Sequence, residues 1–153
     1  MDDIVKAALK KWPNVPACYD WLALDANYTA SHARYDNGDY IPNAFENAAQ
    51  IGVSVVKGPW EASLRLRHLG PYPLIEDNSQ RDPGSNVVNF RAAWKRGALE
   101  VFGQVLNVFD SKDKDIAYWY ESYIPAVDSA PTQGRLSRVV EPRTLRLGLR
   151  LTF

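Results

Sequence analysis

Hydrophobic and polar residues alternate along most of the chain, and the clearest case is its last eleven residues, RTLRLGLRLTF. Successive side chains of a strand point to opposite faces, so the four leucines and Phe153 share one face while threonine, arginine and glycine share the other. The same alternation predicts strands in five more segments. They are 19–36, 46–58, 60–70, 86–97 and 98–110, and an aromatic segment, 116–124, is expected to form a further strand.

Turn chemistry separates these segments. Asn37-Gly38, Lys57-Gly58 and Lys95-Arg96-Gly97 predict tight turns, and residues 110–115 predict a polar turn. Residues 70–85 and 125–142 are rich in proline, glycine and polar groups and predict two long loops. Near the N-terminus, a short amphipathic helix is expected to end before Pro13. The predicted fold is all-β, an antiparallel meander of about seven strands (19–153) that follows an N-terminal extension with a short helix and a proline-containing linker (1–18).

The wholly apolar strand faces have two possible environments. In a soluble β-barrel or sandwich they cover a core, whereas in a transmembrane β-barrel they face lipid and the polar faces line a wet lumen. The longest segments have about the 9 to 11 residues that a tilted transmembrane strand needs. No helix is expected after residue 18 to cover either face. The pattern therefore favours part of a transmembrane barrel, with a soluble sheet and a self-contained eight-stranded barrel as alternatives.

The barrel interpretation assigns roles to individual side chains. An arginine facing lipid costs roughly 2 to 4 kcal/mol at the bilayer midplane, so the arginines of the polar faces are expected to point into the lumen. Aromatic residues near strand ends are expected to form girdles at the two interfaces. The predicted lumen-facing residues are Arg65, Arg67, Arg91, Arg146 and Arg150. The predicted girdle residues are Trp60, Trp94, Tyr118, Trp119 and Tyr120.

Composition excludes several other functions. Lysine plus arginine and aspartate plus glutamate both number 18 in 153 residues, so no basic excess indicates a nucleic-acid partner. The single cysteine, Cys18, and the isolated His32 and His68 do not form a metal-binding pattern. Asp110, Asp113 and Asp115 lack the glycine and the distant glutamate of a calcium-binding loop. Neither a nucleophile motif nor a phosphate-binding loop is present, so we expect no enzyme activity, no metal and no cofactor.

Several motifs resemble those of a known family. Arg146-x-Gly148-x-x-Leu151-x-Phe153 is similar to the C-terminal signal by which outer-membrane barrels are recognised for assembly. The segment 105–122 resembles the "N-L-F-D" turn and following strand of TonB-dependent outer-membrane receptors, with Val108 in place of leucine. Residues 33–35 and 41–45, Ala-Arg-Tyr and Ile-Pro-Asn-Ala-Phe, resemble two further motifs of these receptors.

The resemblance, which extends over 19–153, implies a fold and a function. Such receptors form a 22-stranded barrel around a plug and import siderophores, cobalamin, sugars or other scarce nutrients with energy supplied through TonB. We therefore expect a C-terminal barrel fragment of such a receptor, located in the outer membrane and not competent for transport alone. The expected partners are outer-membrane lipid, the barrel assembly machinery, an unknown small ligand and, through a plug that the chain lacks, TonB. The loop 125–142 is expected to be extracellular.

Overall fold

The computed structural model describes residues 20–126 and 129–153, and within them it contains strands and no helix. The predicted all-β, antiparallel fold is confirmed, while the short helix predicted near the N-terminus lies outside the described residues. The strands are β1 (Leu22–Ala30), β2 (Asn47–Lys57), β3 (Trp60–Leu69), β4 (Tyr72–Pro73), β5 (Arg81–Asp82), β6 (Ser85–Arg96), β7 (Leu99–Leu106), β8 (Lys114–Ser122), β9 (Thr132–Val139) and β10 (Thr144–Leu151).

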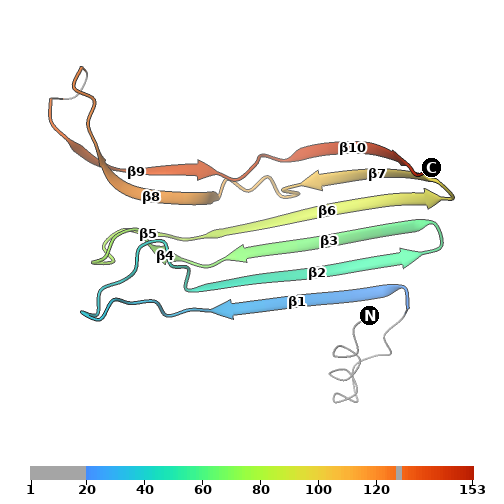
Figure 1. Ribbon diagram of the computed structural model, residues 1–153, viewed down its shortest axis with the longest axis horizontal. Helices are drawn as coiled ribbons and strands as arrows, with labels where there is room; N and C mark the ends of the chain where they lie inside the picture. The colour runs from blue at the N-terminus through green and yellow to red at the C-terminus, as the bar shows by residue number, and fades with distance from the viewer. Residues whose placement is uncertain (1–19, 127–128) are drawn as a thin grey trace, which may run out of the picture.

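Six strands form one twisted sheet in the order β1-β2-β3-β6-β7-β10, and every pairing is antiparallel (Figure 1). Tight turns with positive φ at Gly58 and Gly97 join β2 to β3 and β6 to β7 at one end of the sheet. The C-terminus lies at this same end in Figure 1. Two small ladders, β4–β5 and β8–β9, lie beyond the opposite end.

The segment after β7 does not reverse the chain, contrary to the expected turn over 110–115. Figure 1 shows that β8 runs on in the direction of β7, and that β9 likewise leads into β10. Asn107 and Asp110 both have positive φ, 50° and 53°, which asparagine and aspartate tolerate better than most residues. The backbone therefore forms a local bend inside one long, interrupted hairpin.

Side chains stabilise this bend on both strands of the hairpin. The Asn107 amide donates to the carbonyl oxygens of Ser111 and Glu141 at 2.9 Å each, and its side-chain oxygen accepts from the Ser111 N–H. The Asp110 carboxylate accepts from the Arg143 N–H at 3.0 Å. These hydrogen bonds join the break after β7 to the break before β10.

The prediction of a long loop over 125–142 is wrong for residues 132–139. There β9 pairs with β8, from Ser122↔Thr132 to Lys114↔Val139. Residues 132–139 have no apolar face, so their sequence shows no alternation that would predict a strand. They form a strand because they pair with β8. The loop predicted for 70–85 is interrupted by the short β4–β5 ladder.

The buried core lies beyond the end of the six-stranded sheet. Tyr72, Leu74 and Ala117 form its buried cluster, and Phe45 and Trp119 pack against it. The Phe45 and Tyr72 rings meet edge to face with centroids 4.6 Å apart. We call this end the distal end and define it as residues 31–46, 70–84, 114–126 and 129–139.

Candidate lipid-facing and lumen-facing surfaces

Most large apolar side chains of the six strands lie on one face of the sheet. The register places Ile51 opposite Leu66, which lies opposite Val88 on the next strand, and it places Leu145 opposite Val105. Since side chains alternate along each strand, these pairings align the apolar sets of neighbouring strands. We call this surface the apolar face. It comprises Leu22, Leu24, Tyr28, Ile51, Val53, Val55, Trp60, Leu64, Leu66, Val88, Phe90, Trp94, Leu99, Val101, Val105, Leu145, Leu147, Leu149 and Leu151.

This face is exposed. Leu24 and Leu147, on the two edge strands, are 68% and 78% exposed, and Leu64 in the middle of the sheet is 46% exposed. Folded soluble monomers rarely expose one contiguous apolar surface of such extent. The apolar face therefore requires an apolar environment that the described residues do not supply.

The apolar face ends at defined residues, both toward the tight turns and toward the distal end. Trp60 and Trp94 lie opposite each other in register at the end with the tight turns. At the other end His68 is the next residue of β3 on this face after Leu66, and it hydrogen-bonds through both ring nitrogens to Asn47 and Asn86, at 2.9 and 2.8 Å. Trp60 and His68 are eight positions apart on β3, about 26 Å along the strand at the usual rise and about 20 Å along the membrane normal at the roughly 40° tilt of a barrel strand. An outer-membrane barrel carries an apolar band roughly 25 Å tall.

The predicted girdle residues occupy two different settings. Trp60 and Trp94 lie at the edge of the apolar face, and Trp60 is exposed. Tyr118 and Tyr120 are exposed on β8, beyond the bend that follows β7. Trp119, between them, instead packs against the buried cluster of the distal end. The interfacial role of the other four stays a prediction, while Trp119 contributes to the core.

The opposite, polar face carries the five arginines predicted to face a lumen. Each lies between two apolar-face positions of its own strand, or directly beyond them, and each is ion-paired with a carboxylate. The pairs are Arg65–Asp25 (2.9 Å), Arg67–Asp115 (2.9 Å), Arg91–Glu100 (2.6 Å), Arg146–Glu141 (2.8 Å) and Arg150–Glu100 (3.1 Å). Arg91–Glu100 and Arg150–Glu100 join neighbouring strands, Arg65–Asp25 reaches across β2, and Arg67–Asp115 reaches β8. These five arginines are therefore compensated by carboxylates rather than left as free positive charge.

One aromatic residue interrupts the polar face, and its position explains a glycine. Phe102 lies opposite Gly148 in register. A Cβ atom on Gly148 would lie 2.3 Å from the Phe102 ring, so only glycine leaves room for the ring there. The Arg91 guanidinium stacks over the same ring, 4.9 Å from its centroid. The sequence places Gly148 in the predicted assembly signal and Phe102 on the polar side of β7, but it gives no sign that the two residues meet.

The four residues of the predicted assembly signal do not form one cluster. Arg146 and Gly148 belong to the polar face, whereas Leu151 lies on the apolar face and is exposed. Phe153 follows β10 and is fully exposed. Recognition by an assembly machinery therefore stays a prediction.

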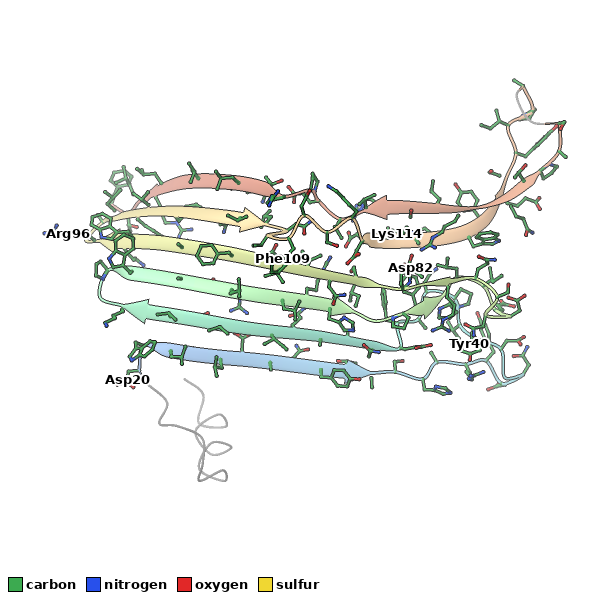
Figure 2. All side chains as sticks on the ribbon, turned by 180° about the vertical axis from the view of Figure 1, so that it is seen from behind. Asp20, Tyr40, Asp82, Arg96, Phe109 and Lys114 are labelled. Carbon is green, nitrogen blue, oxygen red and sulfur yellow. The ribbon has the colours of Figure 1, made fainter. Side chains whose placement is uncertain are left out.

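Ion pairs join the elements of the distal end. Figure 2 shows Asp82 and Tyr40 at the end opposite Arg96. Asp82 is fully buried, accepts from the Gly84 N–H at 2.9 Å and pairs with Arg135 of β9. The Tyr72 hydroxyl accepts from the Ala117 N–H at 3.0 Å. Burial raises the pKa of Tyr72, so it stays protonated at neutral pH.

The three aspartates considered for calcium each have a protein partner. Arg138 and then Arg67 hold the pKa of Asp115 below its usual value, and Asp113 accepts from the Asn86 N–H at 2.8 Å. The Arg143 N–H and Lys112 likewise lower the pKa of Asp110. Among the described residues, no three His, Cys, Asp or Glu side chains are grouped for a metal ion. Within the same ranges no helix is long and apolar enough to span a bilayer.

Comparisons with known proteins relate this fold to a receptor barrel. A family described as "Protein of unknown function (DUF2946)" matches residues 1–35. No curated protein matches the chain. The crystal structure of the ferric yersiniabactin uptake receptor FyuA from Yersinia pestis is similar, with a TM-score of 0.70 and 20% identity over 93% of this chain. The aligned part is 22% of that receptor, so this chain spans about a fifth of its length. The fold of the chain is therefore similar to part of that uptake receptor.

Proposed function

We propose that the chain forms a C-terminal part of the wall of a TonB-dependent outer-membrane receptor, which imports a scarce nutrient such as a siderophore, cobalamin or a sugar. The observation that carries the proposal is the exposed apolar face opposite a polar face of ion-paired arginines. Lipid would cover the first and the lumen would solvate the second. The alternation of the two along every long strand is the pattern of a transmembrane barrel.

Three further observations support the proposal. The apolar face is bounded, by a tryptophan pair on one side and by the His68 hydrogen bonds on the other, as the apolar band of a barrel is bounded at its two interfaces. The fold is similar to part of an uptake receptor. β1 and β10 are the edges of the six-stranded sheet, and unpaired strand edges are not tolerated in lipid. Further strands would complete the wall, so this part alone would not transport.

Fractionation of the source cells tests the proposal. An antibody against the peptide 129–142 is used on outer-membrane, inner-membrane and soluble fractions. The proposal predicts a band in the outer membrane and a mass several times the 17.2 kDa of this chain. A 17.2 kDa band confined to the soluble fraction would refute it and favour a soluble β-protein that binds an apolar ligand or a protein partner. Cells with the gene deleted provide the control for antibody specificity.

A further inference from the structure

Two cationic side chains lie on the apolar face at the end with the tight turns. Lys57 is the last residue of β2 and lies opposite Trp60 in register. Arg96 is the last residue of β6 (Figure 2), and it lies two positions beyond Trp94 and opposite Leu99. Residues that are opposite in register share a face of the sheet, so both cations share the apolar face with the tryptophan pair.

The two cations lack the carboxylate partners that the arginines of the polar face have. Each of those five arginines pairs with an aspartate or glutamate, whereas Lys57 and Arg96 form no ion pair within the part of the chain that the structure describes. Both side chains are exposed. Lys95, the residue before Arg96, lies on the opposite face of the strand, across from Glu100. The positive charge of Lys57 and Arg96 is therefore left for a partner outside the described residues.

The described acidic side chains at this end do not compensate the two cations. Glu61 and Glu100 belong to the polar face, where Arg91 pairs with both. Asp20 precedes β1 and forms no ion pair with a described residue. This edge of the apolar face therefore presents uncompensated cations to an approaching anion.

Lipid is the partner whose chemistry fits both the apolar face and the charge at its edge. Lysine and arginine lay their hydrocarbon stems along apolar surface and extend their charged ends toward water. Tryptophans such as the exposed Trp60 favour the boundary between hydrocarbon and head groups, and the phosphate groups of phospholipids lie at that level. An acidic protein segment would pair with the cations but would leave Trp60 and the apolar face uncovered.

We infer that Lys57 and Arg96 bind the phosphate of an anionic phospholipid whose acyl chains lie on the apolar face. The Lys57 ammonium and the Arg96 guanidinium donate to phosphate oxygens, and the acyl chains run past Trp60 and Trp94 toward the middle of the sheet. The inference deepens the proposed function and rests on it, because it takes lipid as the cover of the apolar face.

Quenching of tryptophan fluorescence by brominated lipids tests the inference. The full chain is placed in vesicles of equal amounts of phosphatidylcholine and phosphatidylglycerol, and one lipid or the other carries bromine on its acyl chains. We expect phosphatidylglycerol to be favoured beside Trp60 and Trp94 by roughly fivefold for each cation, and high salt to reduce this preference. Equal quenching by the two lipids overturns the inference and leaves the proposed function intact. Absence of quenching by either lipid refutes both.

Variants assign the lipid preference to the two cations. Lys57→Gln and Arg96→Gln are each expected to reduce the preference for phosphatidylglycerol roughly fivefold, and the double variant is expected to show none. Arg96→Lys should keep the preference, because it keeps the charge. Lys95→Gln is the matched control, since it removes the same charge from the neighbouring position on the polar face, and it should also keep the preference. An unchanged preference in the double variant, or an equal loss in Lys95→Gln, overturns the inference.

Discussion

The six-stranded sheet and the distal end follow opposite rules of burial. In the sheet, large apolar side chains such as Leu64 and Leu147 are exposed and charged side chains pair on the other face. At the distal end, Tyr72 and Leu74 are buried and the fully buried Asp82 pairs with Arg135. The distal end is therefore built like a protein in water, and the sheet like a protein whose apolar face meets lipid. The boundary is the level of His68 on β3 and of the bend at Asn107.

The largest expected effect of a single substitution is at the buried carboxylate of the distal end. Asp82→Asn leaves Arg135 without its charge partner, and breaking a buried ion pair costs roughly 3 to 5 kcal/mol. We expect β8–β9 to lose its packing while the six-stranded sheet persists, measured as faster hydrogen exchange in 114–139 alone. Asp36→Asn, an exposed position, is the control. Equal loss of protection in β2 and β3 would contradict the separation of the two regions.

The next largest effect distinguishes the two faces of β2. Ile51 belongs to the apolar face, and its neighbour Gln50 points to the polar face. Ile51→Arg is expected to cost about 2 to 4 kcal/mol in a bilayer and to reduce the amount of assembled protein in the outer membrane. Ser54→Arg, on the same polar face of β2 and opposite Ser63, should assemble normally. If both variants assemble equally well, lipid does not cover Ile51.

A smaller effect is expected on β10. Gly148→Ala places a Cβ atom against the Phe102 ring, and such overpacking typically costs about 1 to 3 kcal/mol. Phe102→Leu combined with Gly148→Ala should recover part of this free energy, measured as a double-mutant cycle by urea unfolding in lipid vesicles. Strictly additive effects of the two substitutions would show that the ring does not press on Gly148.

The smallest effect is a dependence of the distal end on pH. The pKa of Asp115 is lowered in the folded chain, so its contribution to stability is present above the unfolded pKa, about 3.9, and is lost as the pH falls through the lower, folded pKa. We expect proteolysis of β8–β9 to increase below about pH 4, and Asp115→Asn to remove that part of the change. An identical pH profile in the variant would contradict this assignment.

Alternation predicted the sheet well and the distal end poorly, for a physical reason. One face of each of these strands lies against a uniformly apolar environment, so every second residue is apolar. Leu145 and Leu147 show this alternation directly in the sequence. The polar positions of Arg65, Arg91 and Arg150 follow from the same alternation, but their ion-pair partners lie on other strands and depend on register. At the distal end β9 carries no periodic signal, and the bend at Asn107 and Asp110 depends on positive φ and on contacts with Glu141 and Arg143. The periodicity of a short segment cannot predict contacts between residues that are far apart in the sequence.

The central claim, that lipid covers the apolar face, is tested most directly by a scan of nitroxide labels along β2. Single cysteines are placed at positions 50 to 55 in a Cys18→Ser background, and the chain is measured in outer-membrane vesicles with oxygen and with a water-soluble nickel complex as relaxation agents. The account predicts high oxygen and low nickel accessibility at 51, 53 and 55, and lower oxygen accessibility at 50, 52 and 54. Labels at 51, 53 and 55 that neither agent reaches would show a protein core on that face and contradict the account.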